Sequence, residues 1–486
     1  MTYRKTEFVI GSLVVCVVLL VGCPAAAAES ELSGEVRERE LTGWLTVVHG
    51  DPAGGSPIEP ENRYFFHPDD GAAFELAIDG ELLARAGGRE RLDRRRVRVI
   101  FGFDRDPQTF GEAQGPVPVR GLDLAPDPVR DAVTGPQPWV SLLCKFSDVS
   151  AEPRNLSYFQ NMYASAWPGL DHYWRQLSYN TVNVQGSSAV AWVTLPHPVS
   201  HYETASGGDL NAMVNDCTAA ADSMVYFPDY VGINMMFNST FGPYAWGGGR
   251  YLTLDGISRF YRVTWEPPWG YQNVAVIAHE MGHGFGLPHS NNADGDGSPY
   301  DNPWDVMSNS WGYAVSDATY GTVGKGTISY HLDMLGWLSS QHRLVISETG
   351  LHDVTIDHLA LDTTSNLRMV KIQIPSSNRF YTLEVRDQEG YDGNLPGFAV
   401  IIHEVDTGRR EDAWLVDPVN PADGADEGAM WKVGECFNDA ANEISVCVIS
   451  STADGFNVRI GYGETGTVFF DGFESNGFGA WSSVVE

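Results

Sequence analysis

The sequence HEMGHGFGLPH, residues 279–289, decides the fold of the middle of this chain. Apolar side chains recur before and within it at the spacing of one helical face, namely Val274, Ile277, Ala278, Met281 and Phe285. This spacing predicts a helix over residues 273–285. The opposite face of that helix presents His279 and His283 one turn apart, close enough for both imidazoles to bind one cation.

A third histidine follows the predicted helix. Gly286 comes shortly after His283, and a glycine there can adopt the positive φ that ends a helix and turns the chain sharply. The turn returns His289 to the same cation, while Glu280 lies beside the ligands without being one of them. Three neutral imidazoles leave a fourth position for water, as in a catalytic zinc site. The pattern predicts Zn²⁺ on His279, His283 and His289, with Glu280 as general base.

This combination of residues is rare by chance. With 13 His, 63 Asp and Glu and 52 Gly in 486 residues, random order would produce it in fewer than about one chain in a few thousand. A fortuitous histidine cluster is therefore a weak alternative. A metal-free, degenerate relative is a better one, but it would more often have lost Glu280 or a ligand.

At these residues the chain resembles the metzincin metallopeptidases, whose pattern H-E-x-x-H-x-x-G-x-x-H is followed by a turn that carries a methionine. The matching turn is WDVMS at residues 304–308. The resemblance implies a zinc endopeptidase acting on proteins or peptides, with Met307 as an apolar floor beneath the three ligands. LPHS at residues 287–290, an acidic loop, this turn and LGWL at residues 335–338 follow one another as in the gametolysin-type family. Similarity to the immune-inhibitor-A type is weaker.

One position departs from the metzincin pattern. Some relatives have a tyrosine two positions after the turn methionine, where it can reach the metal, and here Asn309 occupies that place. Tyr313 lies further on and is a candidate for stabilising the oxyanion. Catalysis is therefore expected to rest on Glu280 and the metal.

Changes in composition and in the pattern of apolar residues divide the chain into parts. Residues 29–130 contain short β-like runs between Gly, Pro and Asp and predict a small N-terminal β domain or pro-segment. Residues 135–340 mix apolar strands with helical segments, which predicts an α/β or α+β catalytic domain of the metzincin kind. Residues 341–463 alternate between apolar and polar side chains and predict a C-terminal β-sandwich. Residues 464–486 form an acidic, aromatic tail.

Latency in several metzincins depends on a pro-segment cysteine that caps the zinc. Between Cys23 and Cys144 this chain has no cysteine. If residues 29–130 are a pro-segment, inhibition must use another device, such as a blocking strand or a carboxylate. A permanent accessory domain is the equally open alternative.

The composition limits the partners of the protein. A formal charge of -32 argues against nucleic acid and anionic membrane surfaces, because acidic groups repel phosphate. A non-catalytic surface or matrix-binding protein with a vestigial zinc domain is the rival function, since both flanking parts are rich in predicted strands. His279, Glu280, His283 and His289 are all present in the sequence, which favours the enzyme over the binding protein.

The first residues predict export. Residues 1–28 combine a basic start, an apolar run and small residues, which is typical of a signal peptide. LVGC at residues 20–23 resembles the box before a lipid-modified cysteine, so Cys23 could carry a membrane anchor. The protein is therefore expected to be secreted, with an outer-membrane or cell-surface lipoprotein as the alternative.

Four cysteines remain after the signal, and export makes disulfides the default. Three pairings are open. Cys436 and Cys447 flank a turn-prone segment and are expected to form a disulfide across a hairpin. This pairing leaves Cys144 to pair with Cys217. Free buried thiols are the alternative.

Two other groups of polar residues are less decisive. Asp294, Asp296 and Asp301 lie among glycines and amides after His289 and could hold Ca²⁺, although the EF-hand pattern is missing and a solvated acidic loop is favoured. Glu384 and Arg386 are expected to form an ion pair on one strand face, since residues two apart share a face.

Overall fold

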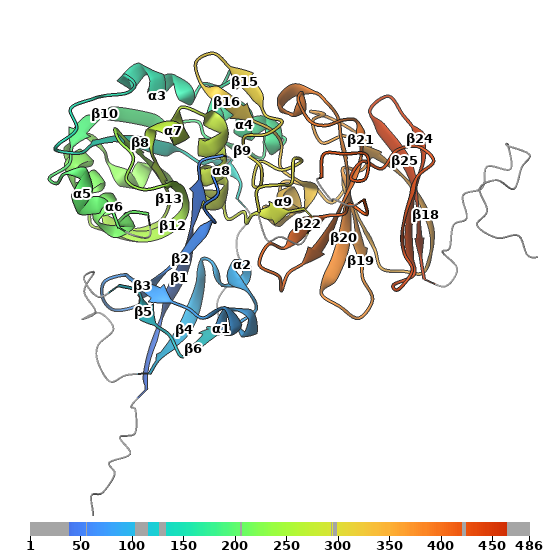
Figure 1. Cartoon of the computed structure of the whole chain (residues 1–486), viewed down its shortest axis with the longest axis horizontal. Coiled ribbons are helices and arrows are strands. Elements are labelled where there is room, and N and C mark those ends of the chain that lie inside the picture. Colours follow the sequence, from blue (N-terminus) through green and yellow to red (C-terminus); the bar gives the residue numbers. More distant parts are fainter. Residues whose placement is uncertain are drawn as a thin grey trace, which may run out of the picture.

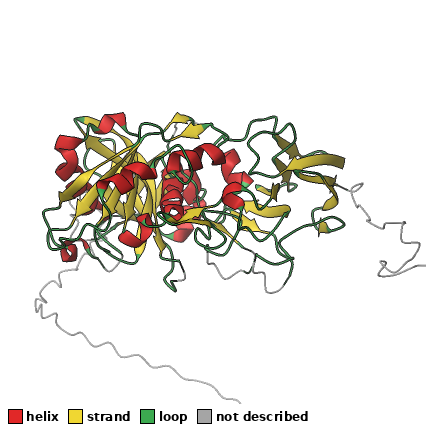
Figure 2. Ribbon diagram, turned by 90° about the horizontal axis from the view of Figure 1, so that it is seen from above, coloured by secondary structure: helices red, strands yellow, loops and turns green. Residues whose placement is uncertain are grey.

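The computed structural model describes residues 38–54, 56–102, 115–125, 133–204, 207–292, 294, 299–419 and 424–463. The predicted signal peptide, Cys23, Asp296 and the tail lie outside these residues. The described chain is a mixed α/β structure with several sheets, in which strands predominate. Helices surround the sheet of the middle part, whereas the C-terminal end consists of strands (Figures 1 and 2).

The middle part is built on five strands of one sheet, in the order β10-β8-β11-β13-β12. Their bounds are β8 (Trp139–Lys145), β10 (Ser188–Thr194), β11 (Gly232–Phe237), β12 (Tyr244–Leu254) and β13 (Ile257–Glu266). The first four in that order are parallel, and β12 runs antiparallel to β13. Every residue of β11 is buried, as expected of a strand that is covered on both faces.

Helices cover both faces of these strands. They are α3 (Leu156–Met162), α4 (Leu170–Leu177), α5 (Val199–Tyr202), α6 (Leu210–Ala221), α7 (Pro268–Tyr271) and α8 (Val274–Phe285). One hydrophobic cluster joins α3, α4 and α8 to the sheet, and a second joins α6 to the opposite face. The predicted disulfide between Cys144 and Cys217 is confirmed and ties β8 to α6.

The N-terminal part continues the same sheet. Its elements are β1 (Arg39–Pro52), β2 (Glu61–Pro68), β3 (Phe74–Ala77), α1 (Gly80–Arg85), α2 (Arg89–Leu92), β4 (Arg95–Phe101), β5 (Val117–Pro118) and β6 (Gly121–Leu124). They enclose a hydrophobic cluster of their own. The end of β1 also pairs antiparallel with β12, so this part and the middle part share one 11-stranded sheet (Figure 1).

Two sheets form the C-terminal part. One has the order β14-β22-β21-β20-β19-β17, and the other has the order β18-β25-β24-β23. Their bounds are β14 (Ser290–Asn291), β17 (Arg343–Ile346), β18 (Gly350–Asp357), β19 (Met369–Gln373), β20 (Arg379–Arg386), β21 (Ala399–Asp406), β22 (Ala413–Leu415), β23 (Cys436–Asp439), β24 (Ile444–Ser451) and β25 (Gly455–Tyr462). Apolar residues of both sheets meet in one core.

Two local predictions in the C-terminal part are confirmed. Cys436 and Cys447 lie opposite each other on the β23–β24 hairpin and form a disulfide. The guanidinium Nη1 of Arg386 lies 3.2 Å from Glu384 Oε1, and both side chains are fully buried. Asp392 completes this ion pair by accepting from Arg386 at 2.8 Å, which explains how the charges are tolerated in the core.

The remaining strands and α-helix are short: β7 (Gly135–Pro136) pairs with β9 (Val182–Asn183), β15 (Val315–Asp317) pairs with β16 (Gly321–Gly324), and α9 is Ser329–Met334. Within the described ranges, no helix has the length and apolar character needed to cross a membrane.

Candidate metal centre

Helix α8 carries the first half of the site. Asn273 precedes it at the N-cap position, every residue from Val274 to Phe285 is buried, and Gly286 ends it with φ of 104° in the left-handed region. The helix packs tightly on β12, because a Cβ added at Gly247 would lie 2.3 Å from the Glu280 carbonyl oxygen. A glycine at this position of β12 therefore brings α8 close to the strand that pairs with β1.

The three predicted histidines converge. The Nε2 atom of His283 lies 3.1 Å from the Nε2 atoms of both His279 and His289, and the last two are 3.3 Å apart. All three side chains are buried. The left-handed Gly286 makes this possible, because it turns the chain after α8 and returns His289 toward the helix.

Two backbone carbonyls fix the orientation of the imidazoles. His279 Nδ1 lies 2.7 Å from the carbonyl oxygen of Val306, and His283 Nδ1 lies 2.8 Å from that of Leu287. A carbonyl can only accept, so each Nδ1 carries a proton, and in the neutral imidazole each Nε2 then directs a lone pair at the centre. Burial also lowers the pKa of His283 to about 3, which keeps it neutral. Lone pairs this close repel one another unless a cation lies between them.

A fourth group, Asp51, lies among the histidines and was missed in the sequence. It comes from the end of β1, and its Oδ1 lies 2.8 Å from His289 Nε2. Its Oδ2 lies 3.4 Å from His279 Nε2 and 3.3 Å from His283 Nε2. Asp51, His279, His283 and His289 form a buried group that could hold a metal ion.

Glu280 points into the site without a hydrogen-bonding partner on either carboxylate oxygen among the described residues, although it is fully buried. Burial raises its pKa well above the ordinary value, and the charges of Asp51 and Glu266 raise it further. Glu266, at the end of β13, has its pKa raised to about 8, mainly by burial. A carboxylate held in this way is a strong candidate for proton transfer.

The turn at residues 304–308 lies against the helix that carries the histidines. Met307 is buried, and a Cβ added at Gly282 of α8 would lie 2.4 Å from its Sδ atom. Asp305 anchors the turn by accepting from the Met307 backbone N–H at 3.0 Å, and it also pairs with His331. Although burial opposes it, His331 holds the pKa of Asp305 well below its usual range. Met307 thus packs against the helix that carries the histidines.

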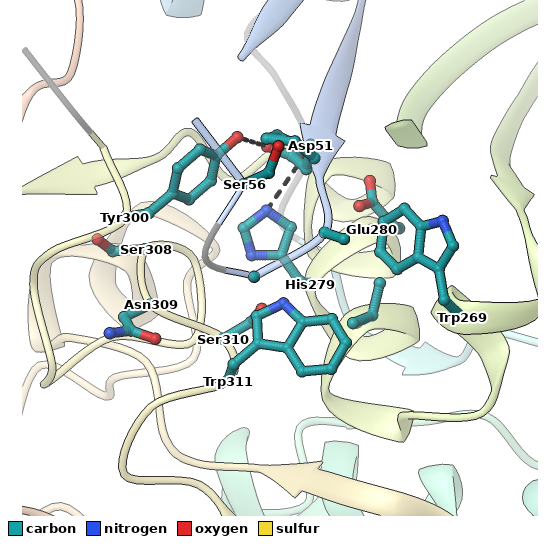
Figure 3. A pocket seen from close by; sticks show the side chains of 14 residues that line it. Asp51, Ser56, Trp269, His279, Glu280, Tyr300, Ser308, Asn309, Ser310 and Trp311 are labelled. Carbon is teal, nitrogen blue, oxygen red and sulfur yellow. Dashed lines mark hydrogen bonds and ion pairs between the residues drawn. The ribbon is translucent and has the colours of Figure 1, made fainter. Parts of the chain in front are cut away.

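A cavity of about 430 Å³ opens beside Asp51, His279 and Glu280 (Figure 3). The indole rings of Trp269 and Trp311 lie along one side of it. The cavity is large enough for a side chain of a ligand, with apolar walls next to the carboxylates and histidines.

The tyrosine of the site is Tyr300 and not Tyr313. Its hydroxyl donates to Asp51 Oδ1 at 2.5 Å (Figure 3). Its ring lies 5.5 Å from that of His289. Tyr313 is 42% exposed and does not line the cavity, whereas Asn309 does. The tyrosine was expected after the methionine turn, but the tyrosine whose hydroxyl contacts Asp51 comes from the loop before that turn.

No model of a known protein family matches this chain, and neither does any curated protein or solved structure.

The described part of the acidic loop offers no second metal-binding group. Asp301 Oδ1 accepts from the backbone N–H of Asn292 at 3.0 Å, and the backbone N–H of Asp294 donates to Asn292 Oδ1 at 2.8 Å. Among the described residues, only the group around Asp51 brings three or more suitable side chains together. Asp296 lies outside these residues, so a calcium site in this loop stays a prediction.

Proposed function

We propose that this protein is a zinc-dependent endopeptidase related to the metzincins and most similar to the gametolysin type. The observation that carries the proposal is the convergence of three imidazole Nε2 atoms beside the buried, unpartnered carboxylate of Glu280, at the wall of a cavity. A metal site alone would not need such a carboxylate. A hydrolase needs it as a base for water.

The spacing of the histidines fits zinc. Tetrahedral Zn²⁺ with Zn–N bonds of about 2.0–2.1 Å requires nitrogen atoms about 3.3 Å apart, and the three Nε2 atoms are 3.1 to 3.3 Å apart. Imidazole ligands also suit zinc better than calcium or magnesium, which prefer oxygen. His279, His283 and His289 would hold the ion.

The side chains can divide the work of peptide hydrolysis. Bound zinc would polarise the scissile carbonyl and lower the pKa of water toward about 7. Glu280 then accepts the proton of the attacking water and delivers it to the leaving amine. The Tyr300 hydroxyl, which now donates to Asp51, is positioned to donate to the oxyanion once that carboxylate has left. The resemblance at residues 279–289 and 304–308 is what points to peptide bonds.

Metal analysis and casein hydrolysis test the proposal. We expect about one zinc per purified chain, and cleavage of unfolded casein that 1,10-phenanthroline stops. Because Asp51 lies among the ligands and would compete with water for the metal, three forms are assayed. They are the full chain, the Asp51→Ala variant, and the full chain after limited trypsin treatment and addition of a trypsin inhibitor. Absence of stoichiometric zinc, or casein cleavage by none of the three, would refute the proposal.

Asp51 also gives the rival function specific support. Four protein ligands around a buried zinc ion are typical of a closed, structural site, which would suit a non-catalytic surface or matrix-binding protein. The two functions differ in the trypsin-treated form: zinc without any casein cleavage favours the binding protein.

Export is part of the proposal. The two disulfides support an oxidising compartment. Mass spectrometry of the protein from the medium and the membrane of producing cells distinguishes free secretion from a lipid on Cys23, since the anchored form would carry the mass of the acyl chains.

A further inference from the structure

The end of β1 occupies a strand edge beside the metal donors. Residues 48–52 of β1 pair antiparallel with residues 244–248 of β12, and Asp51 lies opposite Ala245. Without this pairing, β12 would be the outer strand of the middle part, because its other neighbour is β13. An open strand edge binds an extended peptide by backbone hydrogen bonds. Here the chain fills that edge with its own residues.

Asp51 occupies the centre of the site as well as the edge. Its carboxylate lies within 3.4 Å of all three Nε2 atoms and accepts from Tyr300. A carboxylate is itself a zinc ligand. With a metal on the histidines, Asp51 is therefore placed to fill the position that an open catalytic site leaves for water.

The residues around Asp51 are fitted closely to the site. The ring of His49 stacks on His283, with centroids 4.0 Å apart and planes 8° apart. A Cβ added at Gly50 would lie 2.4 Å from the ring of Trp246, and one at Gly54 would lie 2.6 Å from that of Trp311. Each glycine thus lets the backbone approach its indole more closely than a residue with a Cβ atom could.

A contact from outside β1 holds this end in place. Arg94, which follows α2, donates from Nη2 to the carbonyl oxygen of His283 at 2.5 Å. The neighbouring Asp93 accepts from the backbone N–H of Val47 in β1 at 2.8 Å. The segment after α2 therefore contacts both β1, through Asp93, and the carbonyl of His283 in α8, through Arg94.

We propose that residues 48–54 are an intramolecular inhibitor, in which Asp51 takes the water position on the metal and β1 fills the edge that an extended substrate would use. The full chain is thus latent, held by a carboxylate and not by a thiol. This inference rests on the proposed peptidase function, because a binding protein has no substrate to exclude. It assigns the N-terminal part the role of a pro-segment.

The experiment loads the full chain with Co²⁺ in place of zinc and titrates it with acetohydroxamate, which binds metal only where a ligand position can be exchanged. The variants are Asp51→Ala, Asp51→Asn and the control Asp123→Ala, which removes an exposed carboxylate from β6 of the same N-terminal part. Visible absorption of Co²⁺ reports both metal retention and coordination, and it needs no hydrolysis.

We expect all four proteins to retain Co²⁺ through the histidines. Acetohydroxamate should change the spectrum of Asp51→Ala and Asp51→Asn at concentrations at least about tenfold below those needed for the wild type and Asp123→Ala. The reason is that the apparent affinity of a blocked site is the intrinsic affinity multiplied by the fraction of molecules in which the site is open. Asp51→Asn preserves the size of the side chain and guards against loss of folding in Asp51→Ala.

Two results would overturn the proposal. Wild type that binds acetohydroxamate as tightly as Asp51→Asn would show that Asp51 does not block the metal. Folded Asp51 variants that release Co²⁺ would make Asp51 a permanent ligand of a closed site. If the spectra behave as expected but trypsin-treated protein cleaves no casein, occlusion of the metal is supported and the peptidase function fails.

Discussion

Replacement of Glu280 by glutamine separates a catalytic from a structural role, because it preserves the side-chain shape and removes only the charge. A general base contributes about 10² to 10⁴ to the rate. At about 1.4 kcal/mol per tenfold change, its loss raises the barrier by about 2.7–5.5 kcal/mol. We therefore expect Glu280→Gln to lower kcat for casein by at least two orders of magnitude after trypsin treatment, while the zinc content stays unchanged.

The same substitution should stabilise the fold. Glu280 is fully buried and has no hydrogen-bonding partner among the described residues, and leaving such a group buried costs about 1–3 kcal/mol. Glutamine would also lack a partner, but a buried neutral amide costs less than a buried charge, so the free energy of unfolding of metal-free Glu280→Gln at pH 8 should rise by about 1–3 kcal/mol. Urea unfolding in the presence of a chelator measures it.

Glu384→Gln is the matched control, because Glu384 is equally buried but pairs with Arg386 and accepts from the backbone N–H of Ser329 at 2.5 Å. Its substitution should destabilise the fold by about 1.5–3 kcal/mol, the contribution of hydrogen bonds to a charged group, while Arg386 keeps Asp392 as its other charged partner. If Glu280→Gln loses stability as this control does, and loses zinc as well, Glu280 is structural and the assigned base is wrong.

Three further predictions concern metal, disulfide and pH. His283→Ala should no longer bind stoichiometric zinc. Its thermal unfolding should also lack the stabilisation of about 2.7 kcal/mol that a bound metal gives when free zinc exceeds Kd 100-fold. A Tm of this variant that rises with added zinc would contradict the role of His283 as a ligand. Replacing Cys144 and Cys217 by serine opens a loop of 73 residues and should cost about 4 kcal/mol in urea unfolding, so a loss under 1 kcal/mol would refute that estimate. Burial raises the pKa of Asp412 to about 7, so the folded state keeps a proton on this carboxyl that the unfolded state releases near pH 4. The free energy of unfolding therefore falls as the pH rises from about 4 to 7. Asp412→Asn, which still accepts from Tyr330, should therefore gain about 1–3 kcal/mol relative to wild type between pH 5 and 8, and a constant difference would rule this out.

Local patterns made one part of the site predictable. The spacing of the apolar residues and the glycine after His283 both act within a few turns of chain, so α8, its end at Gly286 and the histidine spacing follow from sequence neighbours. The hairpin disulfide between Cys436 and Cys447 is local in the same sense.

The missed residues depend on contacts distant in sequence. Asp51 and Tyr300 are 249 residues apart, and no periodicity links them. Asp51 ends an ordinary strand, and only the pairing of β1 with β12 brings it to the histidines. The lack of a cysteine in residues 29–130 indicated that a pro-segment, if there is one, must block the site with another group such as a strand or a carboxylate, but it did not identify the residue. Likewise, β14 directly after His289 joins the C-terminal sheet through β22, a pairing that strand alternation cannot predict.

The position of β1 determines how the site can open. Val48, His49 and Gly50 pair with β2 on one side and with β12 on the other, so β1 is an interior strand up to Gly50, and Asp51 is still paired with Ala245 of β12. Asp51 consequently cannot swing away as a mobile loop would. Removing the carboxylate admits a small metal ligand, but an extended substrate needs the strand itself to leave. Because β2 is fixed to the middle part by Arg63, which donates to the Gly208 carbonyl at 2.7 Å, departure requires the N-terminal part to separate as a unit. Such an opening breaks many contacts at once, and chain cleavage accomplishes it far more readily than local fluctuation. Asp51→Ala should therefore cleave casein more slowly than trypsin-treated wild type.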